Sequence, residues 1–129
     1  MDGQGVADTR WRSDTPIYLQ LRDRIAELIL DEVLAQEDPL PSVREVAAQH
    51  QVNPLTVLKG YQLLVEQQIV ESRRGRGMFV MKGAREQLMK LQRKQFLTEE
   101  WPLIRAKVER LELDWDELLA APRTNRKKT

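Results

Sequence analysis

The sequence predicts an α+β chain that is mainly helical, with an N-terminal winged helix-turn-helix domain and a short C-terminal helical dimerisation region. Two observations support this prediction. Apolar residues recur at helical spacing along most of the 129 residues. In the stretch IVESRRGRGMFV, two short apolar runs flank a glycine-containing turn, which is typical of a β-hairpin. The order helix, turn, helix and then hairpin is that of a winged helix-turn-helix.

The predicted division of the chain has four parts. We expect the winged helix-turn-helix domain at 15–82 and the dimerisation region at 83–120, with a disordered tail at 1–14 and a basic disordered tail at 121–129. No stretch approaches the roughly 18 apolar residues of a membrane span, and the first residues lack the apolar core of a signal peptide. Cysteine is absent, which excludes disulfides. We therefore expect a cytoplasmic protein without a membrane partner.

The sequence predicts neither an enzyme nor a cofactor site. No nucleophile, base and orienting group stand together, so no catalytic residue is proposed, and neither a phosphate-binding loop nor a metal-ligand spacing is present. His50 is the only histidine, and a helix-end position is expected for it rather than a metal. The net charge of +1 neither favours nor opposes a nucleic-acid partner. Locally, however, RRGR places three positive charges in four residues.

Two helices are predicted first. Thr15 is expected to cap a helix that begins at Pro16 and ends near Leu34. Ser42 and Glu45 have the spacing of a capping box, which begins a second helix that runs to about His50. Trp11 either docks on the domain or belongs to the tail, and the sequence favours neither alternative.

The stretch VNPLTVLKGY interrupts the helical pattern and restarts it at once. Asn53 is a good N-cap and Pro54 a good first helical residue, so the break predicts a turn between two helices. In the helix that follows, the inner stripe is expected to be Val57, Gly60, Tyr61 and Leu64, and the outer side Leu55, Thr56, Lys59 and Gln62. Gly60 is unfavourable in a helix, which predicts a close approach of another helix.

The rest of the chain is predicted to form a hairpin and further helices. The strands are expected at Ile69–Ser72 and Met78–Met81, and helical spacing resumes at Ala84. Thr98 is expected to cap a second helix, and Asp114 a short last one that ends at Leu119. The apolar positions of this region would join two copies of the chain; they are Leu88, Leu91, Trp101, Ile104, Val108 and Leu111.

A DNA-binding motif of this type would place the outer side of the third helix in the major groove. The hairpin, with Arg73, Arg74 and Arg76, would then lie along the DNA backbone or reach the minor groove. The alternative is a three-helix core with a solvated outer face and a charged turn.

Three stretches, PIYLQLRDRIAELI, LPSVREVAAQHQVNPLTVLKGYQLL and RGRGMFV, resemble the N-terminal domain of GntR-family bacterial transcription regulators, and VNPxTVxKxY is most similar to the YtrA-type branch. The resemblance implies a repressor that binds an inverted-repeat operator as a homodimer, with an unknown effector. It also implies an ABC-transporter operon as the target, because the YtrA-type branch is often associated with such operons. A winged-helix module for protein–protein contact is the alternative. The implied DNA contacts are Arg44, Asn53, Pro54, Leu55, Thr56, Lys59, Arg74, Gly75, Arg76 and Gly77.

The chain departs from the family pattern at four positions. Glu32, Glu37 and Gln68 stand where the family commonly has glycine. The loops around these residues are therefore expected to differ in shape from those of the family. Leu55 stands where the branch often has a polar residue. It would either contact a thymine methyl group or turn back and pack against the second helix.

Overall fold

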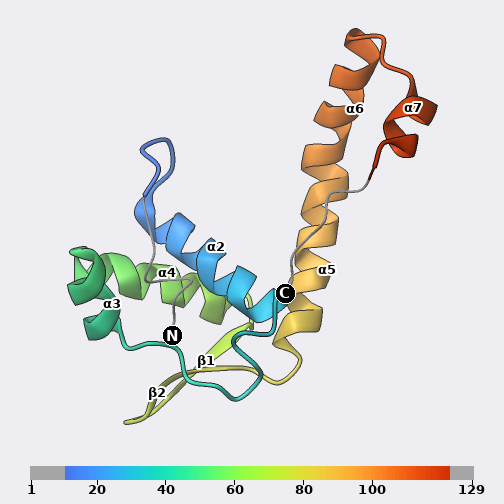
Figure 1. Ribbon diagram of the computed structural model, residues 1–129. Helices are drawn as coiled ribbons and strands as arrows, with labels where there is room; N and C mark the ends of the chain where they lie inside the picture. Colours follow the sequence, from blue (N-terminus) through green and yellow to red (C-terminus); the bar gives the residue numbers. More distant parts are fainter. Residues whose placement is uncertain (1–10, 123–129) are drawn as a thin grey trace. The chain divides into compact units, whose positions relative to one another are not determined.

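The structure, a computed structural model, describes residues 11–122 and divides after Leu91 into two compact units (Figure 1). The first unit contains α2 (Ile17–Leu30), α3 (Val43–His50), α4 (Pro54–Glu66), β1 (Val70–Arg73), β2 (Gly77–Val80) and the start of α5 (Ala84–Gln95). The second contains the end of α5, a π-helical segment η1 (Phe96–Glu100), α6 (Trp101–Arg110) and α7 (Trp115–Ala120). The predicted mainly helical α+β class is confirmed. None of the described helices is long and apolar enough to cross a membrane.

Three of the predicted helix starts are confirmed by their capping bonds. The Ser42 hydroxyl accepts from the Glu45 N–H at 3.0 Å, and the Glu45 side chain accepts from the Ser42 N–H at 3.2 Å. The Asn53 side chain accepts from the Leu55 N–H at 2.8 Å. The Asp114 carboxylate likewise accepts from an amide of α7. These side chains bind amide groups that would otherwise lack a partner at a helix start.

The predicted cap at Thr15 is wrong. Pro16 takes the cap position of α2 without a side-chain bond, and the Thr15 hydroxyl donates to Asp14 instead. The buried amide of Gln20 donates to the carbonyls of Arg12 and Thr15 at 2.8 and 2.7 Å and accepts from the Arg12 N–H. This network folds residues 11–15 onto the domain. Trp11 therefore docks, and only residues 1–10 of the expected N-terminal tail lie outside the described part.

The first helix ends at Leu30 rather than near Leu34, because Glu32 adopts a left-handed backbone with φ +63°. The Val33 N–H donates to the Leu28 carbonyl at 2.8 Å, which closes a Schellman motif. Gln68 ends α4 in the same way with φ +64°, and Glu37 has φ +73°. All three positions thus have the left-handed geometry that favours glycine, at a cost of about 1–2 kcal/mol each for a side-chain-bearing residue.

The hairpin is antiparallel, with Val70 opposite Val80 and Arg73 opposite Gly77. Each strand is shifted by one residue from the prediction. The free edge of β2 is covered by the segment that precedes α3: the Leu40 N–H donates to the Met78 carbonyl at 2.8 Å, and Pro39 bridges to Phe79. The sequence did not predict this third strand-like segment, because DPLP has the composition of a turn.

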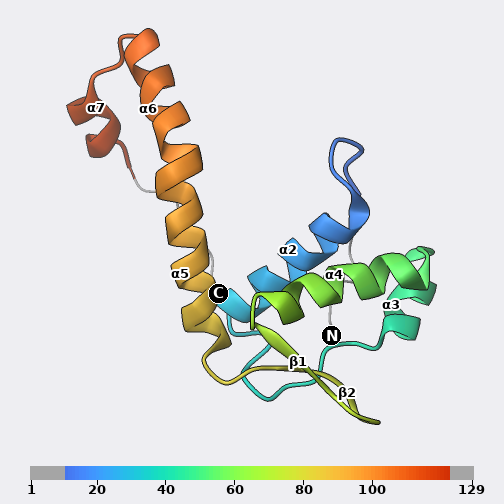
Figure 2. The ribbon, with the colours of Figure 1, turned by 180° about the vertical axis from the view of Figure 1, so that it is seen from behind.

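Helices α2 and α4 pack against each other and cross in both views (Figures 1 and 2). Gly60 of α4 lies at this contact, against Tyr18 and Leu21 of α2. A Cβ atom at Gly60 would lie 2.8 Å from the Tyr18 carbonyl oxygen, so no side chain fits there. The rest of the predicted inner stripe of α4 is fully buried beside this point. The Tyr61 hydroxyl donates to the Pro41 carbonyl at 2.7 Å, and burial, together with the nearby charge of Glu45, raises the pKa of Tyr61. The predicted close approach is confirmed.

The helical run from Ala84 continues without a break to Arg110, so the predicted cap at Thr98 is wrong. The Thr98 hydroxyl instead donates to the Lys94 carbonyl at 2.8 Å within the run. Pro102 has no N–H, and its ring would collide with the Thr98 carbonyl in a regular α-helix. The wider π-helical turn η1 precedes Pro102 and accommodates it. In the second unit, Trp101 packs on the Trp115 ring of α7 at 5.6 Å.

We expect Gly60→Ala to lower the free energy of unfolding by about 1–3 kcal/mol, because overpacking at the helix crossing outweighs the gain in helix propensity. Urea denaturation of the full chain measures the change. Gln62→Ala, at an exposed position of the same helix, is the matched control and should change stability little. A Gly60→Ala protein as stable as the wild type would contradict the close approach.

Candidate nucleic-acid interface

The outer side of α4 is solvent-accessible where the sequence predicted it. Leu55 is 71% exposed, Lys59 is exposed and Thr56 is half-buried. Because Leu55 is so exposed, the alternative in which it packs against α3 is wrong. Asn53 uses its side chain to cap the helix, so its contribution here is to fix the backbone of the first turn.

Arg44 extends this exposed face onto α3. Its side chain is exposed, and it lines one shallow depression together with Pro54 at the start of α4. The other walls are small or apolar: Val43, Ala47, Ala48 and Val52. Arg44 therefore stands next to the first turn of α4, and its side chain is exposed.

The hairpin tip presents two further cations. Arg74 and Arg76 are exposed, and the Arg76 N–H donates to the Arg73 carbonyl at 2.8 Å, which closes the turn. Gly75 and Gly77 have φ of +73° and +107°, values that favour glycine. In Figures 1 and 2 the tip, α3 and the start of α4 lie toward the same side of the first unit.

Arg73 differs from its two neighbours. It forms ion pairs with Glu37 and with Glu71, and its guanidinium lies 4.3 Å from the centre of the Phe79 ring. The hydrogen bonds that the Arg73 guanidinium donates to the carboxylates of Glu37 and Glu71 raise the pKa of Arg73. Arg73 therefore connects the loop before α3 to the hairpin, whereas the sequence analysis expected it to lie along the DNA backbone or to reach the minor groove. The sequence held one indication of this ion pair: Glu71 is two residues from Arg73, so the two side chains lie on the same side of β1.

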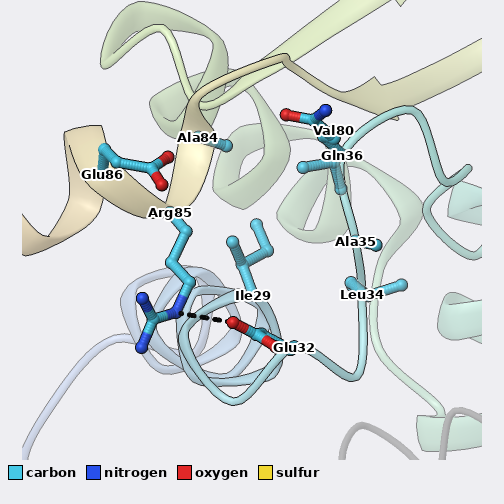
Figure 3. A pocket seen from close by; sticks show the side chains of 9 residues that line it. All are labelled: Ile29, Glu32, Leu34, Ala35, Gln36, Val80, Ala84, Arg85 and Glu86. Carbon is cyan, nitrogen blue, oxygen red and sulfur yellow. Dashed lines mark ion pairs between the residues drawn. The ribbon is translucent and has the colours of Figure 1, made fainter.

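A second hollow of about 260 Å³ lies within the first unit, between the end of α2, the end of β2 and the start of α5 (Figure 3). Arg85 crosses it: its Nε donates to the Leu30 carbonyl at 2.8 Å and lies 3.6 Å from the Glu32 carboxylate. The Gln87 side chain donates to the Gln67 carbonyl at 3.2 Å. These bonds hold the first turn of α5 to the ends of α2 and α4.

His50 packs against Trp11 of the segment that precedes α2. Its ring meets the Trp11 ring edge-on at 5.7 Å, and burial lowers its pKa, with the Arg24 charge adding to the effect. Among residues 11–122, no group of three acidic, histidine or cysteine side chains could hold a metal ion.

The residues predicted for dimerisation are distributed between two environments. Leu88 is 3% exposed within the core of the first unit, and Leu91 packs against that core. In the second unit Val108 is buried and Trp101 is half-buried, whereas Ile104 and Leu111 are exposed. The most exposed leucines there, Leu103 and Leu119, lie off the predicted stripe.

This fold, with its cationic hairpin and exposed second helix of the motif, defines a winged helix-turn-helix protein. Residues 17–80 match the family described as bacterial regulatory proteins, gntR family. The chain belongs to the GntR family of bacterial regulatory proteins.

Three relatives illustrate the similarity. The chain is 43% identical over 77 residues to the HTH-type transcriptional regulator YhcF of Bacillus subtilis and 42% identical over 78 residues to the HTH-type transcriptional repressor YtrA of the same organism. Each match covers 60% of this chain, and the matches span 64% and 60% of these curated relatives, respectively. A GntR family transcriptional regulator from Listeria monocytogenes superimposes with a TM-score of 0.71 at 31% identity, covering 85% of this chain and 95% of that one.

We expect Arg73→Met to lower the midpoint of thermal unfolding, since it removes two ion pairs and a cation–π contact. Arg74→Met, one residue further on and exposed, should leave stability within about 0.5 kcal/mol of the wild type. Thermal unfolding of both variants gives the comparison. Equal stability of the two would mean that Arg73 does not brace the hairpin.

Proposed function

We propose that this protein is a sequence-specific DNA-binding transcription repressor that acts as a homodimer. The observation that carries the proposal is the accessible face formed by Arg44, the outer side of α4 and the hairpin tip. In the same helices the opposite sides are fully buried. The relative YtrA, which is named a transcriptional repressor, supports repression as the outcome.

In this mechanism α4 enters the major groove. Thr56 and Lys59 are suited to hydrogen bonds with base edges or phosphates, and Leu55 is suited to the methyl group of thymine. Arg44 would bind a phosphate or the edge of a guanine. Arg74 and Arg76 would contact the backbone or the adjacent minor groove, because the glycines between and after them let the hairpin tip approach DNA closely.

The proposed partner is a second copy of the chain. Eight large apolar residues of the second unit are more than a third exposed. Single apolar residues are normal on a protein surface, but so many in one short segment indicate a surface that binds a partner. These eight residues are Phe96, Leu97, Leu103, Ile104, Leu111, Leu113, Leu118 and Leu119. Pairing these surfaces around a two-fold axis would cover them and would imply an inverted-repeat operator. An ABC-transporter operon as the target remains a prediction from the YtrA-type resemblance.

The function is tested by selecting bound duplexes from a randomised pool with the full chain. We expect Arg44→Ala to weaken binding to the selected duplex by about 1–3 kcal/mol, through loss of a phosphate or guanine contact. Arg76→Ala should also weaken binding and, if its contact is to phosphate, lower the dependence of affinity on salt. Fluorescence anisotropy at several salt concentrations measures both effects.

Arg105→Ala, at an exposed arginine of the second unit, is the control for loss of one positive charge. Its affinity for the duplex should be closer to that of the wild type than the affinities of Arg44→Ala and Arg76→Ala. If both interface variants bind normally, the proposed docking face is wrong. Weak DNA affinity that does not depend on salt would instead favour a protein–protein module.

The dimer is tested by Leu103→Glu, which places a charge at a leucine that is 72% exposed in the protomer. We expect the dimer to weaken about tenfold or more, because a charge would have to be buried in an apolar interface. Val33→Glu, at a 62% exposed valine of the first unit, is the control. Light scattering across a dilution series measures the mass. Point changes are preferable to removing α5, because Ala84 and Leu88 belong to the core of the first unit.

A further inference from the structure

The ring of Tyr18 lies beside the lysine on the outer side of α4. The Nζ atom of Lys59 is 4.1 Å from the centre of the Tyr18 ring, well inside the range of about 6 Å for a cation–π contact. Tyr18 is half-buried in the first turn of α2, and Lys59 is exposed. Because the two residues are distant in sequence, only the crossing of α2 and α4 brings them together.

Gly60 makes this contact possible. It follows Lys59 directly, and the Tyr18 carbonyl oxygen would lie 2.8 Å from any Cβ atom at position 60. The backbones of the two helices are therefore in contact at the residues that carry the ring and the ammonium group. A larger residue at position 60 would move the start of α2, and the Tyr18 ring with it, away from α4.

We propose that Tyr18 is a positioning residue for DNA binding, whose ring holds the Lys59 ammonium group in place for a DNA phosphate. This inference rests on the proposed function. A lysine side chain is flexible and loses its freedom when it binds a phosphate. The ring restricts that freedom before DNA arrives and covers one side of the ammonium group. The N–H donors on its other side remain available to a phosphate oxygen.

Three substitutions separate this role from the alternatives. Tyr18→Phe keeps the ring and removes the hydroxyl, so it detects a direct contact of the hydroxyl with DNA. Tyr18→Leu removes the aromatic face but keeps an apolar side chain, and Tyr18→Met is a second such variant if the first is unstable. Lys59→Met removes the charge that the ring would hold.

The experiment measures binding of the full chain to a duplex that the wild type selects from a randomised pool. We expect Tyr18→Leu to weaken binding about two- to fivefold, as loss of an exposed cation–π contact implies. Tyr18→Phe should bind like the wild type. In the Lys59→Met background, Tyr18→Leu should cause no further loss. Lys59→Met should also lower the salt slope by about one, whereas Tyr18→Leu should leave the slope unchanged.

The contact itself is tested without DNA by NMR. Ring currents should shift the ε-methylene protons of Lys59 upfield in the wild type and in Tyr18→Phe, but not in Tyr18→Leu. Absence of this shift in the wild type would overturn the inference, as would equal losses from Tyr18→Leu in both lysine backgrounds or a loss in Tyr18→Phe as large as in Tyr18→Leu. A wild-type chain that selects no duplex would instead refute the proposed function itself.

Discussion

The contact of α2 with α4 at Gly60 is the constraint on which the rest of the first unit depends. It turns Val57, Tyr61 and Leu64 into the core, and each of these residues is at most 1% exposed. Tyr61 then reaches the Pro41 carbonyl, and the segment that contains Pro41 also covers the free edge of β2. Because Gly60 has no side chain, α4 can turn this face toward α2. The orientation of α4 is in turn linked, through Tyr61 and the segment that contains Pro41, to the position of the hairpin.

The arginines of the hairpin illustrate why local charge decides more than total charge. Arg73, Arg74 and Arg76 are almost adjacent in sequence, yet Arg73 is bound by two carboxylates and a ring, while the other two are exposed. The positive potential of the hairpin therefore comes mainly from its tip. A chain with a net charge of only +1 can still present a cationic face, because Glu37 and Glu71 bind Arg73 at the end of β1 and leave Arg74 and Arg76 in the turn exposed.

The three positions where glutamate or glutamine replaces the family's glycine retain a left-handed backbone. At Glu32 and Gln68 the hydrogen bonds that close the helix ends form only in that conformation. The chain then continues into the loop after α2 and, after α4, into the core at Ile69. Packing on both sides of these turns outweighs the local strain, which is why side-chain-bearing residues adopt a conformation that favours glycine here.

The sequence by itself determined the elements whose signals are local. These are the capping residues Ser42, Asn53 and Asp114, the buried face of α4 and the glycines of the hairpin, because caps, helical periodicity and positive φ involve only neighbouring residues. Only the tertiary structure decided the docking of Trp11, the pairing of Pro39 with β2 and the ion pair of Arg73 with Glu37. It also decided the contact of Lys59 with Tyr18. Each of these depends on residues that are distant in the chain and meet only when the helices pack, so no local pattern could specify them.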